Sequence, residues 1–167
     1  MGEFTFKILA KDLGKMERKM LKEHPVEVQR ALKAGGTAVV RMLKAKTLAL
    51  SVWDRGKIYR GWRSKALPKK LTVFNTEEHL LYVEGGRRAG ARMPPITPIM
   101  HWVFRHLGVD NVKEAKSIAF AIAKSIAKKG IQARPILSAE GTTEQATELV
   151  MAEVAKAMTR LLRKASR

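Results

Sequence analysis

Residues 71–108 read LTVFNTEEHLLYVEGGRRAGARMPPITPIMHWVFRHLG, and this stretch decides how the chain folds. It opens with a short apolar run that predicts a strand and then reaches a segment, residues 85–92, in which glycine and arginine dominate. Two prolines and a Trp-containing amphipathic segment follow, and Gly108 is typical of a helix end. The order predicts a compact unit that presents a shaped surface to another copy of the chain or to a partner.

Outward from this stretch, the sequence predicts a hairpin on the N-terminal side. One strand is expected from Trp62 onward and a second over 71–74, joined by a turn at 68–70. Leu71 and Val73 should face the same side of the sheet, because side chains alternate along a strand. A further short strand is expected near residues 4–8.

Apolar residues at helical spacing predict helices on both sides of the hairpin. The expected helices span 25 to about 48, 98–107, 112–129 and 142 to about 163, and apolar residues also fall at helical spacing between residues 9 and 21. Pro25 suits a first turn, Thr97 should cap the second helix, Gly130 should end the third, and Thr142 with Gln145 suggests a capping box for the last.

A glycine pair, Gly35 and Gly36, interrupts the first of these helices at a cost of about 1 kcal/mol for each glycine relative to alanine. We favour close packing of a neighbouring element over a functional hinge as the reason for this pair.

These elements predict an α+β fold in which long helices pack on a small, mostly antiparallel β-sheet. A length of 167 residues suits a single domain over 1–167. Within it we distinguish an N-terminal strand and helical segment (1–50), a β-rich part with the Gly/Arg loop and a Pro-Pro arm (51–108), and C-terminal helices (109–167).

The formal net charge is +18, and 18 Lys/Arg face 6 Asp/Glu in residues 1–70. Such an excess favours a polyanionic neighbour, namely nucleic acid, an acidic protein surface or an anionic membrane. The chain has no cysteine, which excludes disulfides and thiolate chemistry. No signal peptide and no membrane-spanning stretch is expected, so we predict a soluble protein in a reducing cytoplasm.

Catalysis is not expected. His101 and His106 are five residues apart on a predicted helix, which differs from the four-residue spacing of a zinc pair. No nucleophile elbow, Walker motif or dinucleotide fingerprint is present, so we predict no catalytic residues, no metal and no cofactor.

Two segments are candidates for contact with a partner. In residues 85–92, Gly86 and Gly90 let the backbone bend, and Arg87, Arg88 and Arg92 supply fork-shaped donors for carboxylate or phosphate. This segment is either a mobile surface loop or a basic finger that orders on a partner. In residues 51–63, aromatic residues alternate with cations, a pattern that either stacks on bases or docks on protein.

The stretch TVFNTEEHLLYVEGGRRAGARMPPITPIMHWV (72–103) resembles the small neck and tail-completion proteins of tailed bacteriophages, which include tail terminators and minor tail components. The matching features lie in two segments. They are Asn75, Tyr82, Val83, Glu84, Gly86, Arg87, Pro94, Pro95 and Trp102, followed by Gly130, Ile131, Arg134 and Pro135.

This resemblance implies a structural virion protein that forms a ring at the head–tail junction and acts in tail completion and head–tail joining. The ring is expected to be a hexamer, with a dodecamer as the alternative. Its expected partners are tail-tube and connector or head-closure proteins, with genomic DNA passing through the channel and no membrane. Assembly would occur in the host bacterial cytoplasm.

Under this interpretation Arg87, Arg88 and Arg92 are loop contacts, with Gly86 and Gly90 as their hinges. A docking surface is expected from Trp53, Tyr59 and Trp62. Pro94 and Pro95 form the arm that orders against the next subunit.

The competing hypothesis is a non-specific nucleic-acid-binding basic protein. It fits the net charge of +18. No helix-turn-helix, RNP or finger motif is recognisable in the sequence, which favours the structural role.

Overall fold

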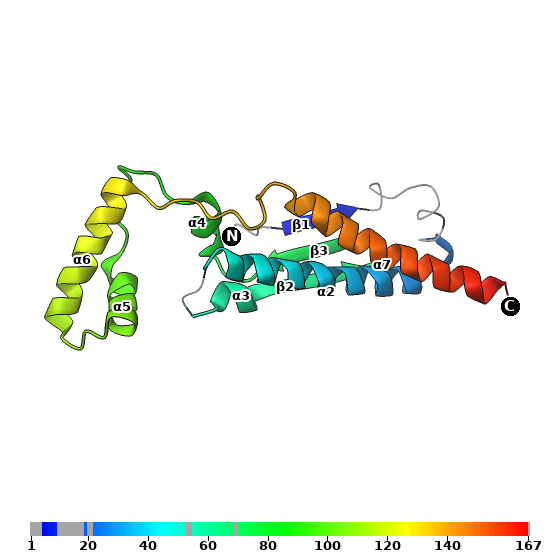
Figure 1. Cartoon of the computed structure of the whole chain (residues 1–167), viewed down its shortest axis with the longest axis horizontal. Helices are drawn as coiled ribbons and strands as arrows, with labels where there is room; N and C mark the ends of the chain where they lie inside the picture. Colours follow the sequence, from blue (N-terminus) through cyan, green and yellow to red (C-terminus); the bar gives the residue numbers. More distant parts are fainter. Residues whose placement is uncertain (1–4, 10–18, 20–21, 53–54, 69, 167) are drawn as a thin grey trace. The chain divides into compact units, whose positions relative to one another are not determined.

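The computed structural model describes residues 5–9, 19, 22–52, 55–68 and 70–166. Within these ranges the chain contains helices and an antiparallel sheet, which confirms the predicted mixed fold (Figure 1). The predicted helical spacing between residues 9 and 21 falls almost entirely outside the described residues.

The chain divides into two compact units. Unit 1 comprises residues 1–84 and 134–167, and unit 2 comprises residues 85–133. The predicted β-rich part, 51–108, is therefore split: its strands belong to unit 1, whereas its Gly/Arg loop, Pro-Pro segment and following helix belong to unit 2.

The sheet of unit 1 has three strands in the order β1-β3-β2, and both pairings are antiparallel. The strands are β1 (Thr5–Leu9), β2 (Trp62–Leu67) and β3 (Lys70–Asn75). Leu71 and Val73 of the central strand are both fully buried on one side, as the alternation predicted.

Two long helices complete unit 1, α2 (Pro25–Ala49) and α7 (Thr142–Ala165), and they lie side by side (Figure 1). Pro25 occupies the first turn of α2, as predicted, since its fixed φ suits that position. Helix α2 packs on both α7 and strands β2 and β3. The main core therefore lies where α2, α7 and the sheet meet.

The glycine pair of α2 explains how this helix approaches two neighbours at once. A Cβ on Gly35 would lie 2.9 Å from Cα of Val150 in α7. A Cβ on Gly36 would lie 2.8 Å from Cδ1 of Leu71 and 3.0 Å from Cβ of Ser64, both in the sheet. Because consecutive helical residues point about 100° apart, α2 occupies the corner between α7 and the sheet. The close-packing explanation is confirmed.

Substitution of the two glycines should have unequal effects. We expect Gly35→Ala to destabilise the protein by about 2 kcal/mol, because the added methyl meets backbone of α7 that cannot move alone. Gly36→Ala should cost less, because its nearest contact is the tip of the Leu71 side chain. Urea denaturation of the two variants measures the difference, and equal effects would contradict this account of the packing.

The predicted capping box at the start of α7 is wrong. The helix begins at Thr142 with Gly141 in the cap position at φ 72, and Gln145 N donates to Gly141 O at 3.0 Å. The Thr142 hydroxyl instead donates to Ile136 O (3.2 Å) and accepts from Lys46 Nζ (2.6 Å). Thr142 is buried and ties the preceding turn to α2, because these tertiary partners compete successfully with the local cap.

Two short helices flank the hairpin, α3 (Lys57–Gly61) and α4 (Leu80–Gly85). Buried Asn75 joins the end of β3 to α3 and to the turn that precedes α4. Its Nδ2 donates to Ile58 O at 2.8 Å, and its Oδ1 accepts from Glu77 N at 2.9 Å. The asparagine at the end of this strand therefore has a structural role.

Unit 2 contains a hairpin of two helices, α5 (Ile96–Leu107) and α6 (Val112–Lys129). Gly108 adopts φ 62 after α5, and Asn111 caps α6 by accepting from Lys113 N at 2.9 Å. The bounds of α6 match the prediction, whereas α5 begins at Ile96 with Pro95 in the cap position and not at Pro98 with a Thr97 cap. The core of unit 2 is small, with Val103, Ala115 and Ala119 fully buried.

Candidate functional site

The two segments that carry the family resemblance pair with each other within unit 2. Arg87 and Ile131 form an antiparallel bridge, with Arg87 N donating to Ile131 O (2.8 Å) and Ile131 N donating to Arg87 O (2.9 Å). A Cβ on Gly86 would lie 2.4 Å from Ile131 O, and one on Gly130 would lie 2.3 Å from Arg87 O. Both glycines have positive φ. We call this bridge and its two glycines the stem.

The predicted contact loop continues directly from the stem. Gly90 N donates to Ala127 O at 2.7 Å, which holds the loop against the end of α6. The Arg87 guanidinium donates through Nη2 to Arg92 O, and its Nε is buried without a hydrogen-bond partner among the described residues. Arg88 and Arg92 have exposed side chains. The loop is thus anchored, and two of its three arginines face solvent.

In unit 1, a buried carboxylate holds the segment that leads into α7. Glu84 is only 5% exposed. Its Oε1 accepts from Ile136 N (2.9 Å) and Leu137 N (2.7 Å), and its Oε2 accepts from Ser138 N (3.3 Å) and Ser138 Oγ (2.8 Å). Three successive backbone donors and one hydroxyl therefore converge on one side chain, which satisfies an otherwise costly buried charge.

Arg134 holds the same segment of unit 1 through further hydrogen bonds. Its backbone N donates to Val83 O at 2.8 Å, and its Nη1 donates to the carbonyl oxygens of Leu50 (3.5 Å) and Ser51 (3.3 Å) at the end of α2. Sequence reasoning gave Glu84 and Arg134 no role beyond the resemblance. The available signal was a glutamate that ends an apolar segment just before two glycines.

Removal of this carboxylate should destabilise unit 1. Glu84→Ala leaves one buried and two part-buried backbone N–H groups without their acceptor, and we expect a loss of about 3 kcal/mol in the free energy of unfolding. Glu84→Gln should lose less, because one amide oxygen still accepts. Urea denaturation measures both, and Glu78→Ala at an exposed position is the control, with an expected change within about 0.5 kcal/mol. Equal stability of Glu84→Ala and the control would contradict this role.

The predicted aromatic docking surface does not form as expected. Trp62 is 1% exposed and lies in the core of unit 1, so its assignment to a surface is wrong. Its Nε1 donates to Thr47 Oγ1 at 2.9 Å, and that hydroxyl donates to Leu43 O at 2.7 Å. Tyr59 is half-buried, with Lys44 Nζ 5.2 Å from its ring centre. Trp53 lies outside the described residues.

The Trp62–Thr47 hydrogen bond gives a direct test of this correction. Thr47→Val keeps the shape of the side chain but leaves a buried indole N–H without its acceptor, so we expect a loss of about 2 kcal/mol in unfolding free energy. Thr159→Val is a matched control, because Thr159 also bonds the carbonyl four residues earlier but is exposed. Similar unfolding free energies for the two variants would contradict the buried bond.

Pro94 and Pro95, predicted to form an arm, immediately precede α5. Pro95 is exposed and has extended backbone angles, φ −58 and ψ 133, at the cap position of the helix. Pro94 is half-buried. The pair therefore serves to start α5, and its proposed contact with a neighbouring subunit stays a prediction.

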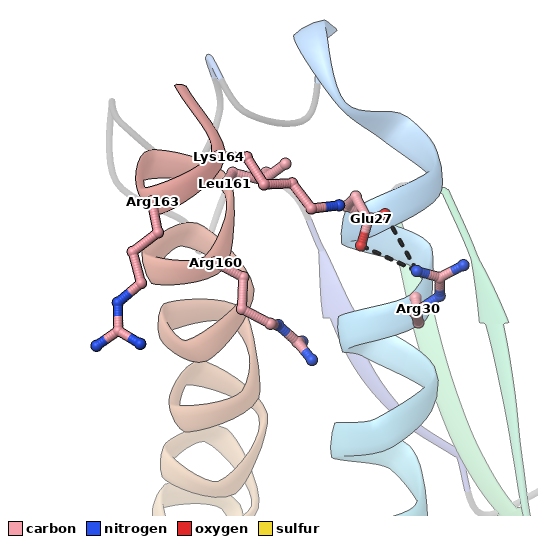
Figure 2. A pocket seen from close by; sticks show the side chains of 6 residues that line it. All are labelled: Glu27, Arg30, Arg160, Leu161, Arg163 and Lys164. Carbon is pink, nitrogen blue, oxygen red and sulfur yellow. Dashed lines mark hydrogen bonds and ion pairs between the residues drawn. The ribbon is translucent and has the colours of Figure 1, made fainter. Parts of the chain in front are cut away.

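Unit 1 also carries an open basic pocket of about 290 Å³ between the start of α2 and the end of α7 (Figure 2). It is lined by Glu27, Arg30, Arg160, Leu161, Arg163 and Lys164. Arg30 Nη1 donates to both carboxylate oxygens of Glu27, at 3.1 and 3.3 Å. The remaining basic side chains attract anions. Two of them, Arg163 and Lys164, lie in the last turn of α7, where the negative end of the helix dipole stabilises positive charge.

Groups suited to other kinds of site are sparse in the part of the chain that the structure describes. No group of three or more His, Asp or Glu side chains there could hold a metal ion. None of the described helices has the length and apolar character needed to span a membrane. Glu77 Oε2 lies 3.5 Å from His79 Nδ1 in an exposed turn.

Comparison of the chain with protein-family models, with curated proteins and with solved structures found no significant match.

Proposed function

We propose that this chain is a structural protein of a tailed bacteriophage that forms a ring at the head–tail junction, where it acts in tail completion and head–tail joining. The fold that this proposal requires is tail-terminator-like, with long helices on a small antiparallel sheet. Six copies are expected in the ring, with twelve as the alternative.

The observation that carries the proposal is the stem. The resemblance to phage neck proteins rests on two short segments that are far apart in the sequence, around Glu84–Arg87 and around Gly130–Pro135. In the folded chain these segments bond to each other directly, through Arg87 with Ile131 and Val83 with Arg134. Residues that share a structural role in this way support a common architecture more strongly than scattered identities would.

The division into two units also supports assembly. Ring-forming proteins contact neighbours through two different surfaces that repeat around an axis. Unit 2 has a small core of its own and leaves large apolar side chains exposed, which a neighbouring molecule can cover. They are Met93, Trp102, Leu107, Val112, Phe120 and Ile131.

Arg88 and Arg92 remain the proposed loop contacts with an acidic partner, because their side chains are exposed beside the stem. Arg87 contributes to the loop itself through its bond to Arg92 O. The partners of the ring would be tail-tube and connector or head-closure proteins of the virion, with DNA passing through the channel.

The test is the mass of the purified full chain, measured by light scattering at low and moderate salt and followed by electron microscopy. We expect a closed ring whose mass is six times that of the 18.7 kDa chain, or twelve times in the alternative assembly. Short duplex DNA should change this mass little.

A monomer that gains mass only with duplex DNA would overturn the proposal in favour of the non-specific nucleic-acid-binding alternative. In that case the DNA affinity should fall steeply with salt. Neutralisation of four phosphates predicts a loss of about a hundredfold between 50 and 200 mM salt.

A further inference from the structure

The outer face of α6 is a basic stripe. Because helical residues advance by about 100°, one side of this helix carries the buried residues Ala115, Ala119 and Ala123. A flank of the helix, centred about 120° around the axis from these residues, carries five exposed residues, which we call the α6 stripe. They are Lys113, Lys116, Phe120, Lys124 and Lys128. Phe120 is 48% exposed at the centre of the stripe.

The stripe has no internal neutralisation. None of its four lysine ammonium groups has an ion pair or a hydrogen bond with a described residue. Unit 2 has nine Lys/Arg against two acidic residues, Asp110 and Glu114, and neither of these lies within the stripe. The four cations therefore suit an acidic partner surface. That surface should also carry an apolar or small residue opposite the exposed Phe120 ring.

The first half of α7 in unit 1 offers a surface of that kind. Glu144 and Glu148 are exposed, four residues apart and on one face of the helix, and exposed Glu140 precedes them. None of the three has an ion pair with a described residue. We call Glu144, Glu148 and the exposed Ala152 that follows them the α7 face. Such a group is notable in a chain with 15 acidic and 33 basic residues.

The spacings of the two surfaces match when the helices run antiparallel. Lys124 and Lys128 are four residues apart, as are Glu144 and Glu148, which is a rise of about 6 Å in each case. With Lys128 opposite Glu144 and Lys124 opposite Glu148, the next step of four places Phe120 opposite Ala152. A small residue there gives the aromatic ring room to pack.

We propose that the α6 stripe of one copy docks on the α7 face of the next copy and forms the contact that builds the ring. This inference rests on the proposed function and specifies its self-association surface. The two surfaces differ, so the contact is heterologous, and repetition around an axis closes it into a ring. Like charges keep the α6 stripes of two copies apart, which suppresses the symmetric alternative.

A charge-swap experiment with the full chain tests this contact. The first variant, K124E/K128E, makes part of the α6 stripe acidic, and the second, E144K/E148K, makes the α7 face basic. All four positions are exposed, so both variants should fold, and circular dichroism and melting temperature check that they do. The matched controls are K57E/K65E and E78K/D110K, which make the same charge changes at other exposed positions.

We expect each variant alone to self-associate at least about a hundredfold more weakly than the natural chain, because both charge pairs become repulsive. An equimolar mixture of the two variants should recover assembly, since the acidic stripe of one then meets the basic α7 face of the other. The quadruple variant should recover it as well, whereas both controls should assemble normally. Light scattering at about 50 mM salt measures each mass.

The failures are distinguishable. A natural chain that forms rings while both variants also form them overturns this contact but leaves the proposed function standing. A natural chain that stays monomeric across the concentration range overturns both. A monomer that binds duplex DNA, with binding lost in K124E/K128E and unchanged in E144K/E148K, assigns the stripe to nucleic acid instead.

Discussion

Where the chain leaves unit 1 and returns to it, two backbone segments approach so closely that neither Gly86 nor Gly130 has room for a Cβ. This approach permits the paired bonds between Arg87 and Ile131, and it closes the hairpin of α5 and α6 into a unit with its own small core. On the unit 1 side, Glu84 then fixes the turn that leads into α7. That turn precedes α7, which packs on α2 in the main core.

Much of the fold was predictable because its signals are local. The strands around Leu71, the start of α2 at Pro25 and the whole of α6 follow from alternation, helical spacing and end residues. The glycine pair of α2 was also interpreted correctly, since two glycines within a strong helical pattern require a steric reason. The division into two units was missed, because it depends on contacts between segments that are distant in the sequence.

The candidate site was less predictable, for a related reason. Trp62 shares an aromatic and basic segment with Tyr59, yet its indole is buried and bonded to Thr47, and composition does not reveal which ring turns inward. Glu84 resembles an ordinary surface carboxylate in the sequence, because its three backbone donors lie more than 50 residues later in the chain. The Arg87 guanidinium, similarly, donates to the carbonyl oxygen of Arg92 in its own loop. Partners distant in the sequence decided the roles of Trp62 and Glu84, whereas Arg87 bonds within its own loop.

The stem has a consequence for how this protein can be altered. Val83 and Arg134 are bonded to each other on the unit 1 side of the join, and Arg87 and Ile131 are bonded on the unit 2 side. The chain thus leaves and re-enters unit 1 at neighbouring points, which is the geometry of a domain insertion. A tight turn in place of the intervening residues would preserve the connection between α4 and α7. Unit 2 is therefore a continuous insertion between two bonded residues, and the main core is formed entirely by residues of unit 1.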